Sequence, residues 1–358
     1  MQQRDLAEGY SALDIPTQAA LAYVNQYPNG AANSPSMASP GADAHAARML
    51  LVVDAACDLP TAWLHRNKIV VIPLTIKLAD AQTLDVRDDA QGPLFVRHLR
   101  QQPNASALSL SLTPTEVRDR IQPHMAASVE HLLQISFAAS YSQSHLCALR
   151  ATQALVLIHG KVRRTIGNRT PLKAWVFDSK SGLTGTALLL AHAVQLRDRG
   201  VPAADIVSAL DRLRDQLHTL VVPGANRYLR ATLARAEAGP WVGWALSLAT
   251  LFNVFPLLHM STREISAVAR VRGELAAVEH GLALAARQVS FGVTTPIVCV
   301  SYGGDLEALQ ALPSFAALRT ACRAQRAELI VAAMSMTGSA LFGPGALAVS
   351  FASTHFTP

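Results

Sequence analysis

The chain has 358 residues, of which 50% are hydrophobic and 16% charged, with a formal net charge of +6 at pH 7. At about 150 residues per domain this length predicts two domains, and the low charge compared with roughly 25% in average chains excludes wholesale disorder. The basic residues are spread without a run of five, so the net charge does not indicate nucleic-acid binding.

The cysteines and the first residues bear on the compartment. Four cysteines lie far apart without a C-x-x-C pair, which favours a reducing compartment over a disulfide framework or a zinc site. Residues 1–48 carry four prolines among Ala, Ser, Asn and Gly, and they lack the basic start and apolar run of a signal peptide. We therefore expect a cytoplasmic protein with a flexible N-terminal extension, whose folded part begins at Met49.

Strands alternate with helices in the first half of the chain. The predicted strands are residues 49–54 (MLLVVD), 69–78 (IVVIPLTIKL), 132–136 (LLQIS) and 174–178 (AWVFD). Helical patterns cover residues 114–125, 144–158 and 185–198, and Asp58 and Pro60 suit the cap and first turn of a further helix. This order predicts a doubly wound, mostly parallel sheet, in which ligands bind beyond the carboxyl ends of the strands.

The order of elements changes after Gly200. Helices are predicted at residues 203–217, 225–237, 268–287 and 305–323, and strands at 219–222, 294–301, 327–333 and 346–351. The fold class is therefore α/β with two domains, residues 49–200 with the parallel sheet and residues 201–358 with a mixed sheet.

Residues 238–262 raise a membrane alternative, because they contain no charged side chain and about 20 such residues can span a bilayer. Glycines and prolines interrupt the segment, so we expect a buried helix followed by an extended segment. The uncharged tail from residue 329 is broken by Gly338, Gly343 and Gly345 and is also expected to be core.

Eight short motifs occur in one order along the chain. They are residues 54–60 (DAACDLP), 71–74 (VIPL), 109–116 (SLSLTPTE), 135–143 (ISFAASYSQ), 177–179 (FDS), 251–257 (LFNVFPL), 271–272 (VR) and 343–347 (GPGAL). In this order they resemble the D-S-x-x-D-L-P, V-x-P-L, T-S-Q-P-S-P-x-E, I-S-S-x-L-S-G-T-Y, V-x-D-S, L-L-N-I-K-P-I, V-R and G-P-G-A-L motifs of the DegV family. These are bacterial fatty-acid-binding proteins, some of which deliver fatty acids to a fatty acid kinase.

The head-group site that the resemblance implies is only partly kept. The family combines a hydroxyl from T-S-Q-P-S and the Ser of S-G-T with an Arg from a G-G-R turn and a His before G-P-G. Ser109 and Ser140 keep the hydroxyls, but Leu341 stands at the His position and residues 230–240 contain no G-G-R. Tyr141 replaces the glycine of S-G-T and would crowd a close backbone approach. We expect a remodelled site.

A bound fatty acid needs an apolar tunnel, worth about 0.8 kcal/mol per buried methylene, and donors for its carboxylate, whose unpaired burial is costly. The uncharged segments 238–262 and 329–351 are candidate tunnel walls. The candidate ligand-binding residues are Ser109, Ser111, Thr113, Ser140, Ser142 and Arg272.

Each candidate also has a purely structural interpretation. The first three hydroxyls can form an ordinary loop with helix caps before Glu116, and Ser140 and Ser142 can cap the following helix. Arg272 can neutralise a carboxylate, meet a partner protein, or simply be exposed at the start of a helix.

Three further polar residues invite a functional interpretation. Asp54 and Asp178 end strands and are interpreted as structural hydrogen-bond acceptors, and Cys57 as a small loop residue rather than a reactive thiol. The sequence contains no G-x-S-x-G, G-x-x-x-x-G-K-[ST] or H-E-x-x-H motif, and its twelve histidines show no ligand spacing. We expect no catalytic residue, metal or cofactor.

The leading hypothesis is a cytoplasmic binding protein that holds one long-chain fatty acid or related lipid between its domains. A fatty acid kinase is the partner that the resemblance implies; neither nucleic acid nor stable membrane insertion is expected. The alternative is an acyl hydrolase or transferase that uses Ser140 or Cys57 in the cleft, and a third option is a membrane protein anchored through residues 238–262.

Overall fold

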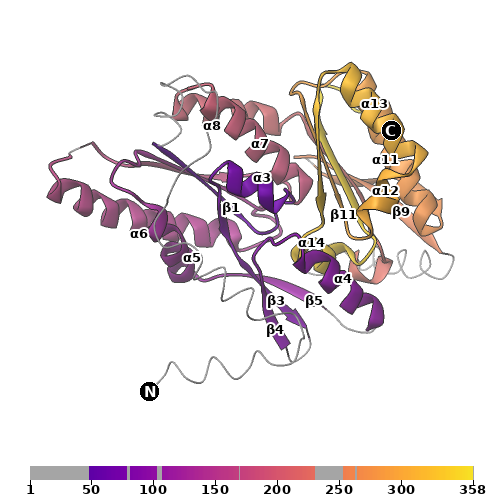
Figure 1. Cartoon of the computed structure of the whole chain (residues 1–358), viewed down its shortest axis with the longest axis horizontal. Helices are drawn as coiled ribbons and strands as arrows, with labels where there is room; N and C mark the ends of the chain where they lie inside the picture. Colours follow the sequence, from indigo (N-terminus) through magenta and orange to yellow (C-terminus); the bar gives the residue numbers. More distant parts are fainter. Residues whose placement is uncertain are drawn as a thin grey trace.

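The computed structural model of the chain describes residues 48–78, 81–102, 107–168, 170–229, 253–262 and 264–357. The strands of these residues form three sheets (Figure 1). The predicted N-terminal extension, apart from Arg48, and the first part of segment 238–262 lie outside the described residues. Within the described ranges, every helix is too short or too polar to cross a bilayer.

A four-stranded parallel sheet forms the centre of the first half. Its order is β2 (Val70–Ile72), β1 (Met49–Asp54), β6 (His131–Ser136) and β7 (Lys173–Asp178). One face is covered by α3 (Thr61–Arg66), α7 (Thr184–Asp198) and α8 (Ala203–Arg214), the other by α5 (Pro114–Ile121), followed by the 3-10 helix η2 (Gln122–His124), and α6 (Ser144–Thr165). The predicted doubly wound parallel sheet is confirmed.

A six-stranded mixed sheet forms the second half. Its order is β10 (Ile265–Arg272), β9 (Val254–Met260), β8 (Leu217–Val222), β13 (Leu347–Ala352), β11 (Ile297–Tyr302) and β12 (Glu328–Ala333). Only β11 and β12 pair in parallel. Helices α11 (Glu274–Ser290), α12 (Leu306–Gln310) and α13 (Pro313–Ala324) cover the outer face. The predicted mixed sheet is confirmed.

A small antiparallel sheet lies below the two large ones in the view of Figure 1. It consists of β4 (Ala81–Asp85), β3 (Leu74–Leu78) and β5 (Ala107–Ser111), and α4 (Gln91–Gln101) and α14 (Met336–Phe342) pack against it. Because α14 belongs to the end of the chain and the strands to its beginning, this small sheet joins the two halves.

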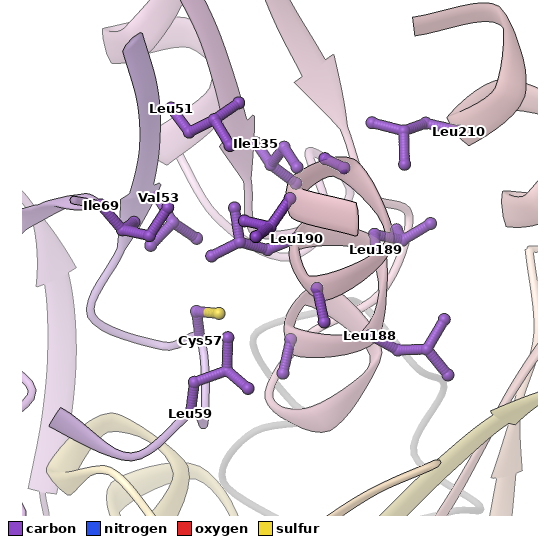
Figure 2. Close-up of a cluster of buried hydrophobic side chains, with 14 of the residues drawn as sticks. Leu51, Val53, Cys57, Leu59, Ile69, Ile135, Leu188, Leu189, Leu190 and Leu210 are labelled. Atoms are coloured by element: carbon purple, nitrogen blue, oxygen red, sulfur yellow. The ribbon is translucent and has the colours of Figure 1, made fainter. Parts of the chain in front are cut away.

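Helix α7 occupies the middle of the molecule. It contacts β6 on one side and β11 and β13 on the other, and it is apolar almost all round, as a helix between two sheets must be. Figure 2 shows Leu190 on the side of α7 that faces Leu51 and Ile135, with Leu188 on the far side. The core is therefore continuous across the predicted domain boundary near Gly200.

Prolines divide two of the predicted elements. Residues 69–78 are not one strand: Pro73, which has no N–H to donate, separates β2 in the parallel sheet from β3 in the small sheet. In the same way Pro313 opens α13, so residues 305–323 form two helices rather than one.

The helix predicted at residues 268–287 is also wrong at its beginning. Residues up to Arg272 belong to the edge strand β10, and α11 begins only at Glu274. Between them Gly273 has φ 92°, a conformation that side chains with a Cβ rarely adopt. Of the helix predicted at 225–237, residues 230–237 lie outside the described residues.

Candidate functional site

The carboxyl ends of the parallel strands carry polar side chains, as predicted. Asp54, Ser136 and Asp178 are the last residues of β1, β6 and β7. Because these strands are parallel neighbours, their ends meet at one edge of the sheet, beside the end of β5 and the start of α6.

Asp54 and Asp178 organise the loop that follows β6. Asp54 accepts hydrogen bonds from the backbone N–H groups of Ala56 (3.2 Å) and Phe137 (2.7 Å), and Asp178 accepts from that of Ala139 (3.1 Å). Burial raises the pKa of Asp54 to about 6, and the two backbone donors oppose this rise only in part. The structural interpretation of both carboxylates is confirmed, since together they fix the loop that leads to Ser140.

Three hydroxyls meet where β5 ends and α6 begins. Ser111 lies 3.2 Å from Ser142 and 2.9 Å from Ser144, measured between the Oγ atoms, and the last two are 2.9 Å apart. Each hydroxyl can donate once and accept, so the three can form a closed ring or turn one O–H outward to a ligand. The structure thus brings the predicted residues Ser111 and Ser142 together and adds Ser144.

Ser109 belongs to a second hydroxyl chain. Thr337, in the first turn of α14, donates both its N–H and its O–H to Oδ2 of Asp85, each at 2.8 Å. Ser109 Oγ lies 3.3 Å from Thr337 Oγ1. Since the proton of Thr337 is directed to Asp85, Ser109 must donate to Thr337, and its lone pairs remain for another group.

Ser140 lies in a separate pocket of 320 Å³. The residues that line it are Ser140, Tyr141, Asp178, Lys180, Met260, Ser261, Thr262, Glu264 and Ile265. Met260 and Ile265 also pack against a buried apolar cluster that includes Leu258 on β9. The pocket therefore has polar walls from the loops after β6 and β7, and apolar walls continuous with the interior.

Leu341 lies among apolar side chains, where the resemblance implies a histidine. It packs against the apolar cluster that includes Leu258 and also against the cluster that contains Phe137 and Ala138. This position supplies apolar contact instead of an imidazole.

The structure does not bring Thr113 or Arg272 into these groups. Thr113 is exposed and caps α5: its hydroxyl oxygen accepts from the Glu116 N–H (3.3 Å), and its own N–H donates to the Glu116 carboxylate (2.8 Å). Arg272 is exposed at the end of β10, whereas Ile265, which lines the pocket, is at its start, roughly 20 Å away at about 3.3 Å per residue.

Three polar residues that lie beside the predicted ones were not predicted from the sequence. Ser144 follows Ser142 by two positions at a helix start, which was a usable signal, and Lys180 lies in the D-S-K segment after β7. Thr337 has no local signal, because its partner Asp85 is 252 residues away in sequence.

Cys57 does not have the surroundings of a nucleophile. It is fully buried, and burial together with the nearby Asp54 and Asp58 raises the pKa of its thiol well above the usual range. In the described ranges no three His, Cys, Asp or Glu side chains are grouped as metal ligands would be.

Comparison with known proteins identifies the family. The family model described as "Uncharacterised protein, DegV family" matches residues 48–354. The chain belongs to the DegV family. A DegV domain-containing protein of Xanthomonas campestris pv. campestris is 31% identical over 306 residues, which cover 85% of this chain and 97% of the relative.

Solved DegV structures share the fold. A stearic acid-binding protein from Eubacterium ventriosum superposes with a TM-score of 0.67 at 19% identity, covering 84% of this chain and 97% of the other. The Fatty Acid Kinase (Fak) B3 protein of Streptococcus pneumoniae, loaded with linoleic acid, gives 0.64 at 17% identity and covers 85% and 99%. The two-domain DegV architecture predicted from the motifs is confirmed.

Proposed function

We propose that this DegV protein holds one long-chain fatty acid or related lipid, with the polar head at the hydroxyl-bearing loops and the acyl chain in the apolar interior. The observation that carries the proposal is the pocket at Ser140, whose Met260 and Ile265 walls continue into the buried apolar cluster. A fatty acid needs such a junction, because about 0.8 kcal/mol per methylene favours burial of the chain while the head must keep polar partners.

The head group would be held by hydroxyls and one cation. Ser140 and Lys180 line the pocket, Ser111 and Ser142 stand at the end of β5 and just before α6, and Ser109 lies within β5. Lys180 would neutralise the carboxylate of the lipid, the role that an arginine has in the family pattern. Asp178 and Glu264 also line the pocket, and Asp178 accepts two backbone N–H groups, from Ala139 and Lys180; the Lys180 ammonium is the cation of the pocket that can meet a ligand carboxylate.

A binding role fits these groups better than turnover. The thiol of Cys57 is buried and its pKa is raised, and Ser140 lies beside a lysine and carboxylates rather than a histidine. No cofactor is part of the proposal. A fatty acid kinase is the proposed partner, and the exposed Arg272 is the proposed docking charge for it. All four cysteines are free, which supports the reducing cytoplasm as the proposed compartment of the protein.

Native mass spectrometry of the protein purified from cells tests the binding proposal. We expect a co-purified species with the mass of one fatty acid or related lipid. After lipid removal, Ser140→Ala and Lys180→Gln should each weaken rebinding of a long-chain fatty acid by about tenfold, the effect of losing one polar partner.

Thr113→Ala is the matched control, because it removes another hydroxyl of the candidate set, one that caps a helix instead, and it should leave the affinity unchanged. A protein that carries no lipid and binds none would overturn the proposal. Turnover of an acyl ester that Ser140→Ala abolishes, with lipid binding intact, would favour the hydrolase.

A further inference from the structure

The outward side of α6 exposes large apolar side chains. Leu146 is 43% exposed, Leu149 37% and Leu157 69%. Their spacing of three and eight residues places them on one side of the helix, while Ala151 and Leu155 on the opposite side pack against the parallel sheet. A leucine stripe of this kind on the outside of a helix calls for a partner surface.

The same side of α6 carries charge of one sign. Arg150, Lys161 and Arg164 are exposed between and beyond the leucines. From residue 131 to residue 177 the sequence contains no Asp or Glu, although it contains six Lys and Arg. Arg163, in contrast, is buried. Its guanidinium donates to the carbonyl of Val129 (2.6 Å), so it stabilises the fold and is not part of the exposed surface.

The position of α6 leaves this stripe open along its length. The helix has 22 residues, about 33 Å at 1.5 Å per residue, and lies with α5 on the side of the parallel sheet opposite α7 and α8 (Figure 1). The acidic side chains of α5 are engaged locally, Glu116 by Thr113 and Asp119 by Arg118. They do not neutralise the basic residues of α6.

We infer that this stripe, defined by Leu146, Leu149, Arg150, Leu157, Lys161 and Arg164, is a peripheral docking surface for an anionic lipid bilayer. The helix would lie in the plane of the interface, with the leucines below the headgroups and the basic groups among the phosphates. This goes beyond the proposed lipid binding and does not depend on it.

The charge pattern favours a bilayer over a protein partner. Specific protein interfaces are usually oriented by charges of both signs, whereas this stripe combines exposed leucines with charged residues that are all basic. An anionic surface needs only that combination. Tyr141, which is 43% exposed just before α6, also lines the Ser140 pocket, so docking would place the pocket mouth near the lipid surface.

Co-sedimentation of the full chain with vesicles tests the inference. We expect binding to phosphatidylglycerol-rich vesicles, little binding to pure phosphatidylcholine vesicles, and weakening at high salt. Each basic residue near such a surface contributes about fivefold in affinity, so the triple variant Arg150→Gln, Lys161→Gln, Arg164→Gln should bind about a hundredfold more weakly. The double variant Leu149→Gln, Leu157→Gln should lose a similar amount, because it removes the inserted side chains.

Leu275→Gln with Phe291→Gln is the matched control, since these side chains are 57% and 72% exposed at the two ends of α11. This variant should bind vesicles as the unchanged protein does. Circular dichroism would establish that all variants are folded. The inference is overturned if the anionic vesicles do not bind the protein, if the α6 variants bind them as well as the control, or if the leucines prove necessary only for contact with a protein.

Discussion

His218 on β8 and His259 on β9 form a hydrogen-bonded pair, in which His259 is buried and His218 half-buried. The distance between His218 Nδ1 and His259 Nε2 is 2.9 Å, and His218 Nε2 donates to the carbonyl of Ser353 at 3.1 Å. His259 must therefore donate to His218, with both rings neutral. Phe356 stacks on His259 at 3.8 Å between ring centroids. Burial, with a smaller contribution from His218, lowers the pKa of His259 to about 4.

This pair should make folding sensitive to acid. The unfolded chain binds a proton at His259 near pH 6.5 and the folded chain only near pH 4, so acidification through this window favours unfolding. At about 1.4 kcal/mol per pKa unit, stability from this group falls by roughly 2 kcal/mol between pH 7 and pH 4.5. His259→Gln, which keeps an N–H donor for His218, should lose that much less in urea unfolding between the two pH values.

The comparison with the unchanged protein is essential, because other groups act in the opposite sense. The pKa of Asp54 is raised to about 6, so below that pH the folded state binds a proton that the unfolded state takes up only near 3.8. Protonation of Asp54 therefore stabilises the folded state as the pH falls. A variant His259→Gln with the same pH dependence as the unchanged protein would show that the pair does not resist protonation.

At the same scale, the sequence predicted those site residues that stand at the ends of predictable elements or within the family motifs. Ser142 stands just before the predicted helix α6, and Asp54 and Asp178 end predicted strands and bind loops that directly follow strands. Ser111 was found only through the motif that contains it, because β5 was not predicted. Thr337, Asp85 and the histidine pair could not be predicted, because these contacts depend on how distant strands are placed, and no local pattern encodes that.

At the scale of elements, buried strands and amphipathic helices were predictable wherever one hydrophobic period continued without interruption. β1, β6, β7 and α7 follow the expectation closely. The errors lie at single residues that change the backbone: Pro73 moves the chain from one sheet to another, and Gly273 ends a strand inside an apparently continuous helical pattern. The small sheet was missed because β4 and β5 are short and partly exposed.

Gly273→Ala tests the importance of that junction. Gly273 has φ 92° and no atom within 4 Å of an added Cβ, so the substitution introduces backbone strain without a clash. Such strain costs about 1–3 kcal/mol, and we expect a loss of unfolding free energy of this size in urea denaturation. An unchanged midpoint would mean that β10 and α11 do not need this conformation.

Gly160→Ala is the control with the opposite sign. Gly160 lies inside α6, and an added Cβ would come no closer than 3.9 Å to a neighbouring atom, at Arg164 Nη1. Alanine at such a helical position should stabilise the protein by up to about 1 kcal/mol. The two glycines therefore separate the effect of a special conformation from that of an ordinary helix.

For the molecule as a whole, buried polar groups from the first half hold the start of α14. The prediction that Asp58 caps α3 is wrong. Its carboxylate accepts instead from the hydroxyl of Ser301 at 2.6 Å and from the N–H of Ser335 at 3.0 Å. Arg87, which is 1% exposed, donates to the carbonyls of Cys57 and Ala333. Together with the continuous core around α7, these contacts couple the two sheets.

Such coupling predicts a single unfolding transition for the whole described fold, and Thr337→Val should lower its midpoint without splitting it. Valine has the shape of threonine but leaves Asp85 without one of its donors inside the protein, a loss of about 1–3 kcal/mol. Thr337→Ser keeps the hydroxyl and should lose less. Urea unfolding followed by both circular dichroism and tryptophan fluorescence measures this. Two separate transitions in either variant would mean that the halves fold independently and that the contacts around α14 are local.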